Sequence, residues 1–484
     1  MVYRIEKDAI GEVKVPKDAY YGSFVTRAQE NFNLSGQKIH KELIRSLGII
    51  KLCSAKANMK LGQLDAKRGN AIVKASQEVI DGKWDEWFVL DPFQAGAGTP
   101  NNMNANEVIA NRAIELLGGE KGDYSIVNPN NHVNMAQSSN DVVPTATRIA
   151  SYMLTEKAVE ELSLLEKSFR KKSHEFRGIV KVGRTHLQDA VPILLSQEFD
   201  AYADTVMRSR IRIEKASKAL LELGLGGTAI GTGITAHPKY HSEAIKNIAS
   251  HTGKKFYPTK NRVHMTQSMD SFTEASSSLR NFAIEFIKVI DDLMVLNSGP
   301  KAGFGEISLP DVEPGSSIMP GKVNPSIAEA MKFVCLQVIG CECAIAEAAR
   351  EGNHQLSIMA PIIGFNYFFI CDLLANGSKM MRTFCVNGIV ANKGRIKELF
   401  ESSLVTATAL SPYIGYHETA EVVKIALEEK KTIIQVILER DIVPEADLKK
   451  ILDPSSMARP RETDNTLAKK IRNHKGYKKF ASGA

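Results

Sequence analysis

The chain has 484 residues, of which 43% are hydrophobic and 24% are charged, and its formal net charge is +7. This composition is typical of a globular protein with room for two or three domains and substantial cores. No apolar run reaches the length of a membrane span, and residues 1–12 lack the apolar core of a secretory signal. We therefore expect a cytoplasmic protein with no membrane contact.

The positive charge is concentrated at the C-terminus. Residues 468–484 contain six Lys and Arg and no acidic residue, which leaves the rest of the chain nearly neutral. Aromatic residues are not interleaved with these basic residues as base stacking would require, so we expect no nucleic-acid partner. We interpret the segment as a solvated tail or as one that docks in an oligomer.

The cysteines and histidines do not indicate a metal site. The cysteines form no CxxC pair and lie mostly in helical-looking apolar sequence, so we expect reduced core residues. They are Cys53, Cys335, Cys341, Cys343, Cys371 and Cys385. His237 and His241 could share a helix face, but no third ligand is evident, which favours a plain solvated pair over zinc. We expect no metal and no cofactor.

From residue 91 onward, polar glycine-rich stretches alternate with long segments whose apolar residues recur every three or four positions. In chain order these are the stretches 91–107 and 128–141, helix 152–176, stretch 183–190, helix 197–223, stretch 224–238, helix 268–297, stretch 314–325, and helices 326–350 and 362–388. The periodicity predicts a bundle of five long helices. Most of the polar stretches lead into a helix and would offer hydroxyls and N-terminal amides to a ligand if they converge.

Two of the predicted helices, 326–350 and 362–388, are apolar on more than one face. A single bundle of five helices cannot bury every face of such a helix, so we expect neighbouring subunits to cover them in an obligate oligomer. The alternative is a covering layer from the same chain, but the terminal segments look too polar to supply it.

Common nucleotide-binding motifs are not matched. "GSSIMPGKV" has five residues between its glycines instead of the four of a phosphate-binding loop, and valine stands where the magnesium-binding hydroxyl belongs. "GGTAIGTG" has no strand before it, so it is weak as a dinucleotide site.

Four of the polar stretches together resemble a known family. In chain order these stretches are "GAGTPNNMNANEVIANRA", "VNMAQSSND", "GRTHLQDA" and "GSSIMPGKVNP" (315–325). Together, and in this order, they are similar to the fumarase/aspartase superfamily. The similarity runs from "RIEKDAIGEVKVPKDAYYG" to about residue 455, and the GSSxMPxKxN signature is highly specific.

The resemblance implies an all-α subunit of three domains. These would be a mostly helical N-terminal domain at residues 1–140, a central five-helix bundle at 141–395, and a small helical C-terminal domain with the basic tail at 396–484. Four subunits would pack their bundles into a homotetramer with a twenty-helix core. Each active site would then be shared by three subunits, which agrees with helices too apolar for one bundle.

The resemblance also implies a reaction and a base. Members of the superfamily cleave a C–N or C–O bond by anti elimination, usually releasing fumarate, and negative charge accumulates as an enediolate-like intermediate. Ser316 would be the general base, acting as an alkoxide. A serine hydroxyl is far too weak an acid for this, so backbone amides of a mobile loop bounded by Gly315 and Gly321 would have to lower its pKa.

Other residues would bind a small carboxylate or amino-acid substrate. Lys322, Asn324 and Thr185 would hold the α-carboxylate, because a fixed cation with neutral donors suits such a group. The residues around the other carboxylate, where charge develops, would be Thr99, Ser138, Ser139 and Ser317.

The leaving group would face Asn140 and His186. Glu329 falls where the family pairs a glutamate with the histidine of "GRTH", so it could orient His186 or hold it charged. His186 and Glu329 would then complete the catalytic set with Ser316.

The substrate is open among related lyases. Ala97 and an N-terminal segment like that of Bacillus-type aspartases favour an aspartate ammonia-lyase, which converts L-aspartate to fumarate and ammonia. "QSSND" and "MPGKVNP" are common fumarase spellings and favour a fumarate hydratase. Departures from both patterns suggest a third lyase that expels another amine, such as the trimethylamine-releasing lyase acting on ergothioneine. These departures are Pro100, Asn101, His354 and Ser357.

A non-catalytic role is the alternative from another class, because lyases of this superfamily have been reused as lens crystallins. The intact site residues argue against it. They include Ser316, Lys322, Asn324, His186 and Asn140.

Overall fold

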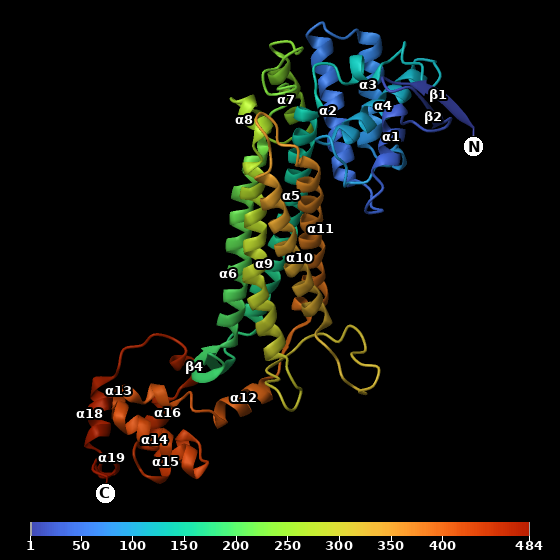
Figure 1. Ribbon diagram of the computed structural model, residues 1–484. Helices are drawn as coiled ribbons and strands as arrows, with labels where there is room; N and C mark the ends of the chain where they lie inside the picture. The colour runs from blue at the N-terminus through green and yellow to red at the C-terminus, as the bar shows by residue number, and fades with distance from the viewer. Residues whose placement is uncertain (1, 484) are drawn as a thin grey trace. The chain divides into compact units, whose positions relative to one another are not determined.

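The computed structural model describes residues 2–483, and it confirms an all-α protein with short two-stranded sheets (Figure 1). The chain divides into two compact units. The first unit contains residues up to Leu162, Arg208–Glu285 and Phe333–Ser378. The second contains Ser163–Met207, Phe286–Lys332 and the residues from Lys379 onward. The division into three domains at residues 140 and 395 stays a prediction.

Long helices contribute residues to both units. They are α5 (Ser139–Glu175), α6 (Leu195–Ser217), α9 (Asp270–Leu296), α10 (Ser326–Ala349) and α11 (Ala360–Phe384). Each was predicted from its apolar periodicity, and most ends agree within a few residues. Helix α5 begins earlier than expected and includes Pro144. A proline so near the N-terminus removes only the hydrogen bond to the carbonyl of Asn140, so the helix continues through it.

The long helices pack through aromatic and polar contacts within each unit. In the first unit, Tyr367 of α11 lies 6.2 Å, centroid to centroid, from the ring of Phe272 on α9, and its hydroxyl is 3.0 Å from Oγ1 of Thr155 on α5. In the second unit, the ring of Phe169 on α5 lies 6.3 Å from both Phe199 on α6 and Phe286 on α9. Periodic apolar positions therefore form a continuous core in each unit.

The rest of the first unit is built around the N-terminal residues. Its elements are β1 (Tyr3–Lys7), β2 (Glu12–Pro16), α1 (Ser23–Asn31), α2 (Lys41–Lys60), α3 (Ala66–Ile80), α4 (Thr99–Leu116), β5 (Glu222–Leu223), α7 (Tyr240–Thr252), β6 (Tyr257–Pro258) and α8 (Arg262–Gln267). Strands β1 and β2 form an antiparallel hairpin, with Tyr3 opposite Pro16 and Lys7 opposite Glu12. Helix α4 begins at Thr99, one of the predicted substrate-binding residues.

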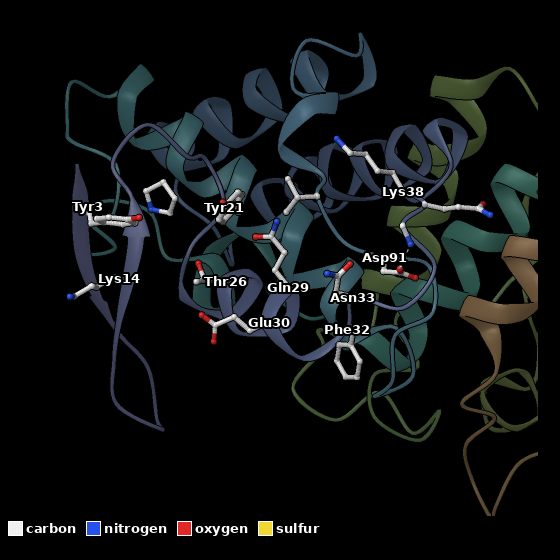
Figure 2. Close-up of a pocket in the computed structure, with 14 residues that line it drawn as sticks. Tyr3, Lys14, Tyr21, Thr26, Gln29, Glu30, Phe32, Asn33, Lys38 and Asp91 are labelled. Atoms are coloured by element: carbon white, nitrogen blue, oxygen red, sulfur yellow. Dashed lines mark hydrogen bonds between the residues drawn. The ribbon is translucent and has the colours of Figure 1, made fainter. Parts of the chain in front are cut away.

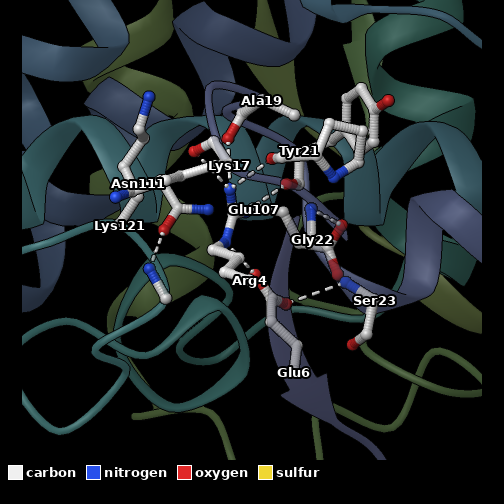
Figure 3. A network of polar contacts seen from close by, with 12 residues as sticks. Arg4, Glu6, Lys17, Ala19, Tyr21, Gly22, Ser23, Glu107, Asn111 and Lys121 are labelled. Carbon is white, nitrogen blue, oxygen red and sulfur yellow. Dashed lines mark hydrogen bonds and ion pairs between the residues drawn. The ribbon is translucent and has the colours of Figure 1, made fainter. Parts of the chain in front are cut away.

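A polar network fixes α4 to the N-terminal hairpin (Figure 3). The guanidinium of Arg4 donates to the carbonyl oxygens of Ala19 (2.8 Å) and Tyr21 (2.7 Å). Glu107 of α4 accepts from the amide of Gly22 at 2.7 Å, and burial raises the pKa of its carboxyl group to about 7. A Cβ atom at Gly22 would lie 2.5 Å from the Tyr124 hydroxyl, so glycine is required at this approach.

The rest of the second unit consists of a hairpin and small C-terminal helices. Its elements are β3 (Val180–Thr185), β4 (Gln188–Leu194), β7 (Ile307–Ser308), β8 (Val390–Ala391), α12 (Lys393–Ser402), α13 (Ser411–Ile414), α14 (Tyr416–Glu429), α15 (Ile433–Glu439), α16 (Glu445–Ile451), α17 (Pro454–Met457), α18 (Asn465–Asn473) and α19 (Lys475–Ala481). Buried side chains of residues 407–471 form a core of their own.

The basic C-terminal segment is not a solvated tail, so that alternative is wrong, whereas docking in an oligomer stays a prediction. It forms α18 and α19, and Ile471 is fully buried in the C-terminal core. Lys470 pairs with Asp447 of α16 at 2.7 Å, while Arg472 donates to the carbonyl of Tyr413 at 3.0 Å. The basic residues lie on the polar face of a helix with a strongly amphipathic pattern, which sequence composition alone does not reveal.

Among the described residues, no helix combines the length and the apolarity that a membrane crossing needs.

Candidate active site

Ser138 and Asp141 cap the start of α5. The amide of Ser138 donates to Oδ1 of Asp141 at 2.9 Å, and the Ser138 carbonyl accepts from the amide of Val142 at 2.9 Å. Asp141 is buried and also accepts from the amides of Gly226 (2.8 Å) and Thr228 (2.9 Å). Burial raises the pKa of its carboxyl group to about 6, although these hydrogen bonds oppose the rise. The start of α5 is therefore fixed by hydrogen bonds from Ser138 and from residues 226–228 to Asp141.

The hydroxyl oxygens of Ser138 and Ser139 both accept hydrogen bonds. Oγ of Ser138 accepts from the amide of Asn140 at 3.3 Å, and Oγ of Ser139 accepts from Nδ2 of Asn102 at 3.1 Å. A hydroxyl that accepts in this way keeps its own proton for another acceptor. The two serines can thus donate to a carboxylate, as predicted for them.

The side chains of Asn140 and Thr99 each donate one hydrogen bond to a backbone carbonyl oxygen. Nδ2 of Asn140 donates to the carbonyl of Ala229 at 2.8 Å, which leaves its Oδ1 as an acceptor. Oγ1 of Thr99 donates to the carbonyl of Gly96 at 2.7 Å, so this hydroxyl oxygen can accept as well. In this geometry the Thr99 hydroxyl oxygen can accept from a donor such as an ammonium group, and its place beside the substrate carboxylate stays a prediction.

Helix α4 begins in a tight turn. Gly98 has φ +79°, and a Cβ atom there would lie 2.7 Å from Val143, so glycine is required. Pro100 lies in the first turn, where a backbone N–H has no partner within the helix, so proline disrupts nothing. The Asn101 side chain accepts from Nε2 of Gln94 (2.9 Å), and the Asn101 amide donates to Oε1 of Gln94 (3.0 Å). The unusual Asn101 therefore stabilises the loop before α4.

The loop at residues 315–324 holds Ser316 in an environment suited to a base. Oγ of Ser316 accepts from the amides of Ile318 (3.2 Å) and Met319 (2.9 Å). Hydrogen bonds to the charged form of an acid lower its pKa, so these donors favour an alkoxide. The amide of Gly315 donates to the carbonyl of Lys322 at 3.0 Å and closes the loop. We call residues 315–324 the serine loop.

The other predicted residues of the serine loop line or adjoin a cavity of about 500 Å³. Lys322 and Asn324 line this cavity, together with Asn297, Ser298 and Asn392. Nδ2 of Asn324 donates to the Gly315 carbonyl at 2.7 Å, which leaves its second proton for a ligand.

The remaining polar groups at and after this loop are exposed. Ser317 and Lys322 are exposed, and the Lys322 ammonium makes no hydrogen bond or ion pair with any residue that the structure describes. Glu329 is exposed in the first turn of α10. A free cation beside neutral donors is suited to a carboxylate.

Thr185 and His186 lie at the tip of the β3–β4 hairpin, which sequence reasoning predicted only as a polar loop. Thr185 pairs with Gln188 across the strands, so His186 and Leu187 form the two-residue turn. Both have left-handed φ angles, +52° and +63°, which such a turn requires and which cost non-glycine residues of the order of 1 kcal/mol each. The turn therefore places His186 on the exposed tip of the hairpin.

Buried charges anchor the base of this hairpin. Glu306 is fully buried and pairs with Lys181 at 3.0 Å and with Arg184 at 2.9 Å. The Arg184 guanidinium also lies 4.1 Å from the ring centroid of Phe304. The tip is therefore presented on a rigid base. No hydrogen bond or ion pair joins His186 to Glu329 within the part of the chain described, so their predicted pairing stays a prediction.

The predicted site residues form two groups along the chain. Those in the first unit are Thr99, Ser138, Ser139 and Asn140. Those in the second unit are Thr185, His186, Ser316, Ser317, Lys322, Asn324 and Glu329. The structure brings Ser138, Ser139 and Asn140 together at one helix start. It also brings Ser316 and Asn324 together in one loop.

The sequence analysis did not single out Lys51 or Asn102, which the structure joins by a hydrogen bond. Lys51 lies inside the apolar part of α2 and is completely buried, and its Nζ donates to Oδ1 of Asn102 at 2.7 Å. A lone lysine within "LGIIKLCSA" is a visible signal of a buried charge.

Other sequence expectations are corrected by burial. His241 is buried, with Nε2 3.2 Å from the carbonyl of Thr259, so it is not half of a solvated pair. Cys343 is exposed, while the other cysteines are buried and free as expected. Ser357 is buried, and its amide donates to the carbonyl of Thr266 at 3.0 Å, whereas His354 is exposed with φ +54°.

A second cavity, of about 470 Å³, lies beside the N-terminal hairpin (Figure 2). Asp91 in its wall accepts from the amides of Ser35 (2.6 Å) and Phe93 (2.8 Å), so this carboxylate already has structural partners. Within residues 2–483, no group of three or more His, Cys, Asp or Glu is arranged to hold a metal ion. None of the residues that line this cavity is a predicted site residue.

Comparison with known proteins identifies the family of the chain. Residues 11–340 match a lyase family and residues 406–459 match the fumarase C C-terminus. An aspartate ammonia-lyase from Bacillus sp. is 46% identical over 94% of this chain and 98% of its own length. A class II fumarate hydratase from Campylobacter jejuni is 42% identical over 95% of this chain and all of its own length.

A solved structure has the same fold. The fumarate lyase:delta crystallin from Brucella melitensis superimposes with a TM-score of 0.92 at 44% identity, over 95% of this chain and all of that one. The matched families together span most of the chain. The protein is therefore a lyase of the fumarase/aspartase superfamily.

Proposed function

We propose that the protein is an aspartate ammonia-lyase, which converts L-aspartate to fumarate and ammonia. The observation that carries this proposal is a set of two acceptors: the hydroxyl oxygen of Thr99, whose proton is donated to the Gly96 carbonyl, and Oδ1 of Asn140, whose Nδ2 is held by the Ala229 carbonyl. An ammonium group can only donate hydrogen bonds, so fixed acceptors suit it. The 46% identity to an aspartate ammonia-lyase supports the same substrate.

In the proposed first step, Ser316 removes a proton from the carbon next to the substrate's β-carboxylate. The amides of Ile318 and Met319 stabilise the serine oxygen as the charged base before this transfer. The C–H electrons move toward the β-carboxylate, which becomes enediolate-like. Ser138 and Ser139 donate to this carboxylate, and their preorganised hydroxyls lower the barrier because the charge develops there.

In the second step, the C–N bond breaks and its electrons leave with the nitrogen as ammonia. The C–H electrons form the double bond of fumarate, and Ser316 keeps the abstracted proton until solvent removes it. Asn140 and His186 face the leaving nitrogen, with Glu329 orienting His186. The α-carboxylate binds to Thr185, Lys322 and Asn324, and Ser317 joins Ser138 and Ser139 at the β-carboxylate.

We also propose a homotetramer in which three subunits contribute to each site. The exposed face of α10 supports this, because Phe333 is 61% exposed and Leu336 is 53% exposed on the same face as Gly340, Cys343 and Ala344. Large apolar side chains at such spacing are typical of a helix that packs against other helices. A cytoplasmic location also stays a prediction.

The proposal is tested by giving the purified protein L-aspartate and L-malate separately, with fumarate absorbance and ammonia measured in parallel. We expect fumarate and ammonia in equal amounts from aspartate, and little fumarate from malate. Fumarate from malate alone would contradict the proposal and assign the second candidate, a fumarate hydratase. That candidate is favoured by the 42% identity to a class II fumarate hydratase.

The third candidate, a lyase that expels a larger amine, loses part of its support. Asn101 pairs with Gln94, and Ser357 is buried against the Thr266 carbonyl, so these departures stabilise loops. Retention of the site groups, including Ser316 and Lys322, likewise argues against a purely structural protein.

A further inference from the structure

Lys51 forms an unusual buried cation beside the serines of α5. Its side chain is 0% exposed, and its Nζ donates to Oδ1 of Asn102 (2.7 Å), Oδ1 of Asn134 (3.0 Å) and Oε1 of Gln137 (2.9 Å). These three amide oxygens match the three protons of an ammonium group. No carboxylate lies within ion-pair distance of Nζ in the described part of the chain.

The nearest opposing charge belongs to Asp141. Burial lowers the pKa of Lys51 to about 7, and the charge of Asp141 on α5 opposes this. Asp141 is engaged with backbone amides of Ser138, Gly226 and Thr228 rather than with Lys51. The groups that face Lys51 from α4 and residues 134–137 are neutral amides. Burial, and to a smaller extent the charge of Asp141, raises the pKa of the Tyr240 hydroxyl on α7, so this group is also neutral. A buried cation that lacks a direct counterion is costly for folding, and such groups are concentrated at functional sites.

The hydrogen bonds connect this cation to Ser139. Because Oδ1 of Asn102 accepts from Lys51, the amide of Asn102 must point its Nδ2 the other way. That Nδ2 donates to Oγ of Ser139 at 3.1 Å and to Oδ1 of Asn134 at 3.2 Å. If Lys51 lost its proton or its side chain, the Asn102 amide could rotate, and the Ser139 hydroxyl would no longer be held as an acceptor.

We propose that Lys51 is a positioning residue for substrate carboxylate binding: it fixes Asn102 so that the Ser139 hydroxyl donates outward, and its unpaired charge is balanced by the bound carboxylate. This rests on the proposed role of Ser138 and Ser139 in carboxylate binding. In a poorly solvated site the attraction between this cation and a carboxylate is stronger than at a surface. Lys51 acts through Asn102 and need not touch the substrate.

The test uses succinate, a dicarboxylate that cannot be eliminated, with its Kd measured by calorimetry on the full-length protein. Lys51→Met should weaken succinate binding about tenfold or more at pH 6.5, and should raise KM much more than it lowers kcat. Asn102→Asp keeps an acceptor for Lys51 but cannot donate to Ser139, so it should weaken binding similarly even if Lys51→Met folds poorly. Unchanged succinate affinity in folded Asn102→Asp would overturn the proposal.

A pH series separates this role from a merely structural one. The wild-type Kd for succinate should rise as pH increases through about 7, because the free protein loses the Lys51 proton there. Lys51→Arg stays charged and should not show that rise. Identical pH profiles for wild type and Lys51→Arg would contradict the proposal.

A matched control is Lys172→Met. Lys172 is also buried, but it pairs with Glu175 at 2.7 Å and donates to the Ile389 carbonyl at 3.0 Å, away from the α5 serines. Its loss should leave the succinate Kd unchanged, and an equal weakening would show that any buried lysine has the same effect.

Succinate binding by wild type without aspartate turnover would reject the proposed function and leave the Lys51 test intact. Absence of succinate binding by wild type would overturn both.

Discussion

At the start of α5, Ser139 accepts from a side chain that is itself buried, and Asp141 behind it is only 3% exposed. In the serine loop, Ser316 accepts from the amides of Ile318 and Met319, whose side chains are 82% and 48% exposed. The first region is fixed by α2, α4 and residues 226–228, whereas the second is held mainly by hydrogen bonds within itself. We infer that the first region fixes the carboxylate at which charge develops, and that the second determines the rate of proton removal while its Lys322 and Asn324 hold the other carboxylate.

The largest effect should come from Ser316→Ala. Without the serine oxygen there is no base at this position, so kcat should fall by roughly 10³-fold or more. Succinate affinity should change little, because the α5 serines are intact. Turnover in the deaminase direction is measured by fumarate absorbance, with oligomeric state checked by light scattering. Undiminished turnover would refute the assignment of Ser316 as the base.

A smaller loss is expected from Gly315→Ala. An added Cβ atom would lie 2.4 Å from the backbone oxygen of Lys322 and 2.7 Å from the amide of Asn324, so the loop must shift. Misplacement of a catalytic group by about 1 Å can cost roughly 10²-fold in rate, so kcat should fall by about that factor. Gly321→Ala is a comparison with open space around its Cβ but a left-handed φ of +76°. A larger change in succinate Kd than in kcat for Gly315→Ala would contradict the division of roles.

The smallest effect should come from Asn101→Ala. This change removes the side-chain acceptor of the Gln94 Nε2 hydrogen bond, so the free energy of unfolding should fall by about 1 kcal/mol. The backbone amide of residue 101 can still donate to Gln94 Oε1, so Gln94→Ala, which removes both bonds, should lose more, and the double variant should lose little more than Gln94→Ala alone. The preference for aspartate over malate should stay the same. A switch in preference would show that Asn101 contacts the substrate after all.

Much of the fold is predictable because long helices are encoded by local periodicity. The segments 268–297 and 326–350 correspond to α9 and α10 almost residue for residue. The serine loop was also recognisable, because the glycines and hydroxyls needed around Ser316 are adjacent in sequence. Local patterns of this kind require no knowledge of tertiary packing.

Long-range contacts account for what the sequence did not reveal. Lys51 and Asn102 are far apart in sequence, and only packing of α2 against α4 joins them. The β3–β4 hairpin has no glycine in its turn, so the usual signal for such a turn is missing at His186 and Leu187. The C-terminal basic residues could be placed on a packed helix only once Ile471 was seen in a core.

The exposed thiol of Cys343 allows a thiol-reactive reagent to label the apolar face of α10. The other cysteines are buried, and burial raises the pKa of the thiols of Cys53, Cys335, Cys371 and Cys385 to about 12. A thiol-reactive dye would therefore attach selectively at Cys343 in the folded chain. Because this residue lies on the same face as Phe333 and Leu336, the rate of labelling reports directly how much of that face is free of other subunits.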